Sequence, residues 1–301
     1  MKRILNYEIT KEYAGQPVLF FLKQHGFSQQ IVTHLKKTEN GILLNGIWAR
    51  VWDIFKENDV LTLTITEIGS SENIVPVKLP FPIVYEDEDL LIINKPAGMP
   101  IHPSQGNFEN TLANAAAYYF SSKNEPFIYR CINRLDKDTT GLLILARNMY
   151  SAARLSDMVA KREIHRTYLA IVSGHLENEG CIKAPIARTD GSTIERQVDF
   201  QRGEYACTHY RLLDTNERYS LAKLRLDTGR THQIRVHMKY IGHPLPGDFL
   251  YNPDYSCISR QALHSYQLDF NHPVTGEKMC FTAPLPKDMD LGWKLKKEDS
   301  F

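Results

Sequence analysis

The chain holds few cysteines, and their arrangement argues against cysteine-based structure. They are odd in number, widely spaced and without a Cys-x-x-Cys pair: Cys131, Cys181, Cys207, Cys257 and Cys280. Disulfide frameworks and thiolate zinc sites use cysteines at short, paired spacings, so neither is expected here. Free thiols are typical of the reducing cytoplasm, which is the predicted location.

Long hydrophobic runs and an excess of one charge are also missing. Residues 1–8 are interrupted by polar and acidic side chains and lack the apolar core of a signal peptide. No later stretch reaches the roughly 20 apolar residues that a membrane span requires. With 36 Lys and Arg against 35 Asp and Glu the net charge is +1, so contact with a polyanion must come from local clustering. We expect a soluble protein without membrane contact.

Several signature motifs are absent as well. The chain has no phosphate-binding Gly-x-x-x-x-Gly-Lys, no dinucleotide-binding Gly-x-Gly-x-x-Gly, no His-Glu-x-x-His and no Gly-x-Ser-x-Gly. His232 and His237 are five residues apart, which is about 140° around a helix, so their rings diverge. A metal site is therefore not predicted.

The composition predicts two unequal globular parts. Of 301 residues, 43% are hydrophobic and 24% are charged, enough for one large core or two domains. Small polar residues followed by prolines over 69–80 predict a linker. We expect a small domain at 11–68, a large domain at 81–290 and a polar tail at 291–301. Strands and helices alternate in the large domain without a strict βαβ order, which predicts an α+β fold with a mixed sheet.

The small domain predicts two short helices followed by a strand pair. Ser28 can cap the second helix, and the stretch 41–46 ends in an Asn-Gly turn. Together with Asn58-Asp59, these features resemble the S4 RNA-binding domain. The Arg that this family usually carries beside the Ser is Gln29 here, which weakens the implied RNA contact. The same pattern also fits any small helix-plus-hairpin domain.

One acid in the large domain stands in an unusual place. Asp136 follows Arg134 and a leucine in a segment rich in turn formers, and Gly141 then leads into an apolar run over 142–146 that predicts a buried strand. A carboxylate held in this way can act as a nucleophile. The same residues also fit an ordinary loop before a strand.

A second segment, residues 224–241, predicts a strand, a Gly turn and a helix capped by Thr231. Helical spacing places three residues toward the core: Ile234, Met238 and Ile241. Three others share a basic face: His232, Arg235 and Lys239. Nearby basic residues extend this positive cluster: Arg218, Lys223, Arg225 and Arg230. The cluster suits a phosphate or carboxylate partner, although such a face is often only solvated.

A third segment, residues 166–174, predicts a strand with Tyr168, Ala170 and Val172 on one face. A tyrosine in a strand is more often a core aromatic than a functional group.

Taken together, these segments resemble the RluA family of RNA pseudouridine synthases over roughly residues 81–285. That family carries His-Arg-Leu-Asp-x-x-Thr-Ser-Gly-Leu-Leu, Lys-x-Tyr-x-Ala-x-Val-x-Gly and Thr-Gly-Arg-Thr-His-Gln-Ile-Arg-Val-His. The matching stretches here are 133–143, 166–174 and 228–237, and 94–98 and 242–248 match two further motifs. Asn133 replaces the family His and Thr140 the Ser; neither change removes the acid.

The resemblance implies a pseudouridine synthase fold with a mixed, largely antiparallel sheet flanked by helices and loops. It implies that Asp136 attacks C6 of a uracil or C1′ of its ribose, with Arg235 as counter-ion and Tyr168 stacking on the base and relaying the C5 proton. The uridine would have to be flipped out of its helix, with Arg134 filling the gap or holding a phosphate. Five residues are expected to contact RNA: Arg134, Arg230, His232, Gln233 and His237.

The implied partner is ribosomal or transfer RNA, with no metal, no cofactor, no obligate protein partner and a monomeric chain. Two alternatives remain at this point. One is a catalytically silent RNA-binding or ribosome-assembly protein on the same scaffold. The other is an unrelated hydrolase that uses Asp136 and a histidine. The target RNA, its uridine and the atom attacked stay open.

Overall fold

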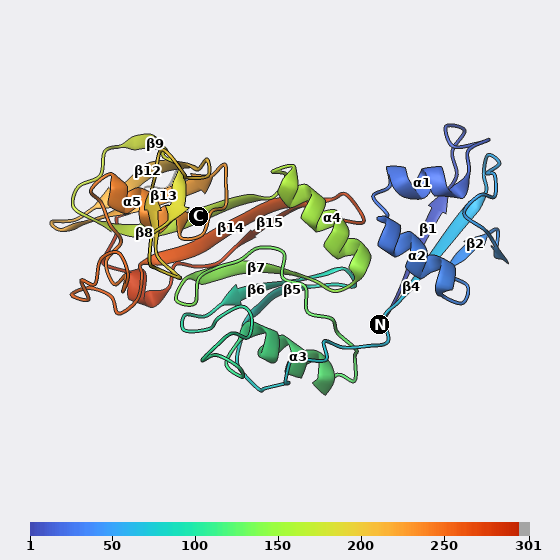
Figure 1. Cartoon of the computed structure of the whole chain (residues 1–301), viewed down its shortest axis with the longest axis horizontal. Helices are drawn as coiled ribbons and strands as arrows, with labels where there is room; N and C mark the ends of the chain where they lie inside the picture. The colour runs from blue at the N-terminus through green and yellow to red at the C-terminus, as the bar shows by residue number, and fades with distance from the viewer. Residues whose placement is uncertain (295–301) are drawn as a thin grey trace.

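Three β-sheets organise the described residues: a small one near the N-terminus, a large one that dominates the rest (Figure 1), and a two-stranded one formed by β10 and β11. The computed structural model describes residues 1–294. The small sheet has the order β1-β4-β2-β3, and the large sheet has nine strands in the order β5-β6-β7-β14-β8-β13-β12-β9, with β15 paired to β14. Within the large sheet β7 and β14 run parallel and the other neighbours antiparallel. The predicted α+β class with a mixed, largely antiparallel sheet is confirmed.

The elements of the small unit are β1 (Lys2–Glu8), α1 (Val18–Gln24), α2 (Gln29–Lys37), β2 (Ile42–Leu44), β3 (Ile47–Trp48) and β4 (Val60–Thr66). Those of the large unit are β5 (Ile83–Glu86), β6 (Leu90–Lys95), α3 (Leu112–Ser122), β7 (Thr140–Ala146), α4 (Met149–Ala160), β8 (His165–Ser173), β9 (Glu179–Lys183), β10 (Ile186–Arg188), β11 (Arg196–Val198), β12 (Cys207–Thr215), β13 (Tyr219–Leu226), α5 (Gln233–Tyr240), β14 (Leu263–Asn271), β15 (Lys278–Thr282) and η1 (Lys287–Met289).

The small unit forms as its local sequence predicts, with one addition. Ser28 caps α2 by accepting a hydrogen bond from the Ile31 amide, and the β2–β3 hairpin turns through Asn45 and Gly46 at φ of 52° and 78°. Strand β1 lies before residue 11, where we expected the domain to begin. It pairs with β4 along its whole length, so the small sheet includes a strand that its own sequence pattern does not indicate.

The two units share a core at α4. The Tyr150 ring of α4 stacks on Phe27 with ring centroids 4.2 Å apart, and its hydroxyl donates to the His25 carbonyl at 3.0 Å. Arg3 of β1 binds both carboxylate oxygens of buried Asp89, at 3.0 and 2.8 Å. These contacts fix the small unit against the large one, and Figure 1 shows α4 between them.

The large sheet is covered on both faces, so its central strands are buried on both sides. Tyr168, Ala170 and Val172 of β8 pack with α3 and α5 in one apolar cluster, whereas Leu169 and Ile171 pack with the C-terminal segment in another. The predicted division of β8 into these two faces is confirmed. Helix α4 covers β6 and β7 on the face opposite α3.

The C-terminal segment differs in part from the predicted polar tail at 291–301. Leu291 and Trp293 pack against a core cluster, and the Trp293 indole donates to the Met289 carbonyl at 2.8 Å. Residues 295–301 lie outside the described part of the chain. Over residues 1–294 no helix combines the length and the apolar character needed to cross a membrane.

Candidate active site

Asp136 lies on a tight turn immediately before β7. The Thr139 amide donates to the Asp136 carbonyl at 3.1 Å. Gly141 then enters β7 with φ of +110°, and a Cβ added there would lie 2.2 Å from the Ser265 carbonyl oxygen of the parallel strand β14. Only glycine fits both the backbone angle and the close approach. Gly141 thus allows β7 to approach β14 closely directly after the turn that carries Asp136.

Buried side chains from distant parts of the chain hold the backbone of this turn. The Lys95 ammonium donates to the Lys137 carbonyl at 2.8 Å, and Arg260 donates to the Asp138 carbonyl at 3.2 Å. The Gln261 amide donates to the Thr139 hydroxyl at 2.9 Å. Burial lowers the pKa of Lys95 to about 7, against the opposing charges of Asp138 and Asp136. Asp136 therefore sits on a preorganised support.

Asn133, which replaces the family His, joins the loop to β7. Its side-chain oxygen accepts from the Ile144 amide at 2.9 Å, and its side-chain nitrogen donates to the Leu142 carbonyl at 3.3 Å. The side-chain amide of Asn133 thus pairs with one backbone donor and one backbone acceptor of a buried strand, because an amide can both accept and donate hydrogen bonds. The other departure, Thr140, places its hydroxyl 2.8 Å from the buried His264 ring.

Arg235 connects two acids. Its Nη1 donates to Asp136 Oδ2 at 2.8 Å, as predicted, but its two-point contact is with Asp248, through Nε at 2.6 Å and Nη2 at 2.7 Å. Asp248 is fully buried and also accepts from the Leu250 and Tyr251 amides. Burial opposes the charge of Arg235, but the hydrogen bond to Asp248 and the two carboxylate charges outweigh it and raise its pKa. Arg235 stays charged and fixed in orientation.

The surroundings of Arg235 differ from the predicted basic helix face. Its side chain is 2% exposed and lies over the Tyr251 ring, 4.9 Å from the centroid, whereas Lys239 on the same helix is exposed. The buried pair with Asp248 explains the difference, because a paired guanidinium can enter a core that an unpaired one cannot. Asp248 was the missed residue; it ends the 242–248 motif.

His232 also differs from the prediction, since it and not Thr231 is the N-cap of α5, with φ of 58°. The Tyr251 hydroxyl accepts from the Arg196 amide and lies 3.0 Å from His232 Nδ1. His232 Nε2 faces Asp136 Oδ2 at 3.9 Å. Burial lowers the pKa of His232, against the charge of Asp136. A neutral ring therefore borders the acid.

Two of the residues expected to contact RNA are turned inward. His237 is fully buried, with one ring nitrogen 2.9 Å from the Thr208 hydroxyl and the other 2.8 Å from the Ala184 carbonyl. Gln233 donates to the Cys207 carbonyl at 2.9 Å and is 3% exposed. Both side chains link α5 to β12, because the first turn of α5 packs directly on that strand.

Tyr168 and Asp136 line one cavity of about 70 Å³, together with Leu226, Leu263 and the α5 residues Ile234 and Arg235. Burial raises the pKa of Tyr168, although Arg166 opposes this shift. Its phenol is therefore neutral at physiological pH. The carboxylate and the phenol thus line one recess, which Arg134 and Arg230 also line.

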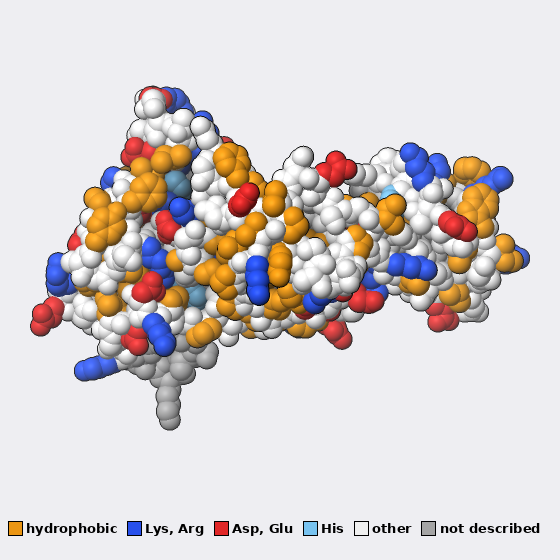
Figure 2. Space-filling view, turned by 90° about the horizontal axis from the view of Figure 1, so that it is seen from below, with side chains coloured by type: hydrophobic (Ala, Val, Ile, Leu, Met, Phe, Trp, Pro, Cys, Tyr) orange, Lys and Arg blue, Asp and Glu red, His pale blue; other side chains and the backbone are white. Residues whose placement is uncertain are grey.

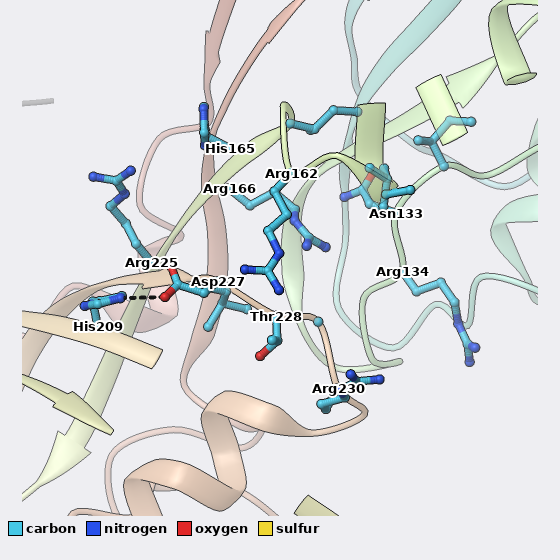
Figure 3. A pocket seen from close by; sticks show the side chains of 16 residues that line it. Asn133, Arg134, Arg162, His165, Arg166, His209, Arg225, Asp227, Thr228 and Arg230 are labelled. Atoms are coloured by element: carbon cyan, nitrogen blue, oxygen red, sulfur yellow. Dashed lines mark hydrogen bonds and ion pairs between the residues drawn. The ribbon is translucent and has the colours of Figure 1, made fainter. Parts of the chain in front are cut away.

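Beside this recess lies a larger, strongly basic groove of about 740 Å³ (Figure 3). Five arginines line it: Arg134, Arg162, Arg166, Arg225 and Arg230. Among residues 1–294, only Arg230 of these five forms an ion pair with a carboxylate, that of Glu204. Acidic and basic side chains are interspersed over the face seen in Figure 2, so the groove is a local concentration of positive charge on a nearly neutral molecule.

The arrangement places one partly exposed carboxylate, fixed by a guanidinium, in a recess that opens beside an arginine groove. A carboxylate held by a cation in a fixed orientation can attack an electrophile. Unpaired arginines in a groove bind phosphates. Fold and site therefore suit an enzyme that acts on a nucleic-acid substrate.

Comparisons with known proteins identify the family. Residues 89–240 match the family described as RNA pseudouridylate synthase. The chain is 38% identical over 281 residues to the uncharacterized RNA pseudouridine synthase YjbO of Bacillus subtilis, covering 93% of this chain and 96% of that one. It is 42% identical over 240 residues to ribosomal large subunit pseudouridine synthase D of Zymomonas mobilis, covering 73% and 74%.

A solved structure agrees: human RNA pseudouridylate synthase domain containing 1 has a TM-score of 0.59 and 26% identity, over 72% of this chain and 89% of that one. The chain belongs to the RNA pseudouridine synthase family and is an isomerase that acts on RNA. The resemblance drawn from the motifs is confirmed.

Proposed function

We propose that the protein converts specific uridines of a structured RNA to pseudouridine with Asp136 as nucleophile. The observation that carries this is the convergence of Asp136, Arg235 and Tyr168 in one recess beside an arginine groove. In the reaction the N1–C1′ bond breaks, the uracil turns, a C5–C1′ bond forms, and a proton leaves C5 while N1 gains one; any bond that Asp136 has formed breaks again. Asp136 attacks C6 of the base or C1′ of the ribose.

The attacking atom is Oδ1 of Asp136. Oδ2 is engaged by Arg235, whereas no donor among residues 1–294 lies within hydrogen-bond distance of Oδ1. The ion pair engages one carboxylate oxygen and leaves the other available. Because the acid is on a turn held through its backbone, little reorganisation is needed before attack.

The target base has to leave its helix to reach this recess, so the proposal includes base flipping. Arg134 is exposed at the border of recess and groove, where it can occupy the vacated position or hold a phosphate. Tyr168 packs against the flipped uracil. Since its phenol is neutral, it takes up the C5 proton only while passing its own proton on, as a relay does.

The substrate class is ribosomal RNA in preference to transfer RNA. The names of several relatives at about 40% identity, ribosomal large subunit pseudouridine synthase D, support this choice.

The S4-like small unit is proposed to add an RNA contact. We also propose that one chain suffices, because Asp136, Arg235 and Asp248 all come from it. We propose further that it works in the cytoplasm, a reducing compartment that suits five cysteines without disulfide bonds.

The test is release of tritium from C5-labelled uridine in unmodified ribosomal and transfer RNA transcripts. Asp136→Asn keeps the shape of the side chain and removes the nucleophile, so release should fall to background while RNA binding persists. Asp138→Asn, two residues along the same turn, is the matched control and should retain activity. Turnover by Asp136→Asn would refute the assignment of the nucleophile. Binding without release by the wild-type chain would favour a silent RNA-binding scaffold.

A further inference from the structure

Outside the recess, four side chains with metal-binding groups converge on three neighbouring strands. Cys181 of β9 stands opposite His209 of β12 in the antiparallel register. Cys207 lies two residues before His209 and therefore on the same face of β12. Asp227 follows β13, and its amide donates to the Cys207 carbonyl at 3.2 Å. Residues far apart in sequence are thus brought together by strand pairing.

The two thiols and the imidazole are spaced like ligands around one ion, whereas the Asp227 carboxylate lies at hydrogen-bond distance from the imidazole. The sulfurs of Cys181 and Cys207 are 3.5 Å apart, and the Cys207 sulfur is 3.6 Å from His209 Nε2. Ligands of a tetrahedral zinc ion, with bonds of about 2.3 Å to sulfur and about 2.0 Å to nitrogen, are roughly 3.4 to 3.8 Å apart. Asp227 Oδ2 lies 3.0 Å from the same His209 nitrogen (Figure 3).

We propose that Cys181, Cys207 and His209, with the Asp227 carboxylate beside the imidazole, form a binding site for a thiophilic divalent cation, for which Zn²⁺ best suits the donors. Two thiolates, an imidazole and a carboxylate are a soft-to-borderline set that favours zinc over magnesium or calcium. On binding, both thiol protons and the Nε2 proton of His209 leave, and Nδ1 carries the remaining ring proton. The exposed side chains of Cys181, His209 and Asp227 give the ion access from solvent.

The site is linked to the active site through Cys207. Its amide donates to the Thr228 hydroxyl at 3.0 Å, and its carbonyl accepts from Gln233 at 2.9 Å, at the start of α5. Thr228 in turn donates to Gln233 at 2.8 Å. A bound ion would join edge strand β9 to β12 and to the segment that leads into α5. It would therefore stabilise the region that carries Arg230, His232 and Arg235, and it would lie at the wall of the arginine groove, which His209 and Asp227 also line.

The experiment measures metal content and cobalt binding of the full-length chain. Protein purified under reducing conditions from zinc-supplemented medium should contain one zinc per chain, and Co²⁺ replacing it should give the absorption of a cobalt–thiolate bond. Cys181→Ser and His209→Ala change exposed side chains and should each abolish both signals. Cys257→Ser and Cys280→Ser, at cysteines outside the cluster, are the matched controls and should keep them. A rise in melting temperature with Zn²⁺ should be seen in the wild type and not in Cys181→Ser.

Two results would overturn the proposal. One is a reduced wild-type chain that holds no zinc and takes up no cobalt, including the case in which peptide mapping finds Cys181 joined to Cys207 as a disulfide before reduction. The other is unchanged metal binding in both Cys181→Ser and His209→Ala. Neither readout involves turnover, so either result would leave the assignment of Asp136 as it stands.

Discussion

The sharpest test of the site is to replace Arg235, whose guanidinium contacts both Asp136 and Asp248. Arg235→Lys keeps the positive charge, but an ammonium cannot make the three planar contacts that the guanidinium makes with Asp136 and Asp248 at 2.8, 2.6 and 2.7 Å. At least one contact is then lost. A hydrogen bond to a charged group contributes about 1.5 to 3 kcal/mol. If the contact to Asp136 is lost, the rate should fall roughly 10- to 150-fold.

The assay compares tritium release at saturating RNA with the thermal stability of each variant. Arg235→Lys should lower kcat with little change in KM, since the contact acts on the nucleophile and not on RNA binding. Arg235→Met should be worse, because it leaves Asp248 charged and unpaired in the core, at a cost of about 3 to 5 kcal/mol. Arg218→Lys, at an exposed arginine, is the control. A folded Arg235→Lys enzyme with wild-type kcat would refute the reasoning.

Three further predictions concern pH, proton transfer and salt. Burial lowers the pKa of His264 to about 4 from 6.5, so the unfolded chain binds a proton that the folded chain does not, and stability present above pH 6.5 is lost as the pH falls towards 4. Between pH 7 and 5 this loss amounts to about 2 kcal/mol; urea unfolding should show it reduced in His264→Gln but not in His175→Gln, an exposed histidine. Tyr168→Phe should bind RNA normally and release tritium about 100- to 10,000-fold more slowly, and unchanged release would remove Tyr168 from the proton path. Arg162→Gln and Arg225→Gln should each weaken RNA binding and reduce the slope of log affinity against log salt by about 0.7 to 0.9; an unchanged slope would place the RNA elsewhere.

Sequence reasoning located the acid and its cation because each stands in a recognisable local pattern. The turn formers around Asp136 and the core spacing of Ile234 and Met238 depend on neighbours within a few residues, and the structure agrees with them. The pairing of Arg235 with Asp136, implied by the resemblance, is present as a 2.8 Å hydrogen bond.

What the sequence did not reveal depends on contacts between distant segments. Asp248 takes the two-point contact that we expected at Asp136, and no spacing rule connects it with Arg235. His237 and Gln233 were expected to contact RNA from the resemblance of residues 228–237 to the family motif, but α5 packs them onto β12. The approach of Cys181 to Cys207 likewise arises from strand register, which short-range patterns do not encode.

The shared core at α4 has a consequence for how a target is selected. Because Tyr150 and Asp89 lock the small unit in place, the two units cannot swing independently as domains on a flexible linker do. An RNA that touched both would have to span a constant distance between its two points of contact. The protein would then select its target partly by the distance between the two contact points on the RNA. Lengthening the RNA helix between these points by a few base pairs would move the uridine out of reach of Asp136, even with the sequence around the uridine unchanged.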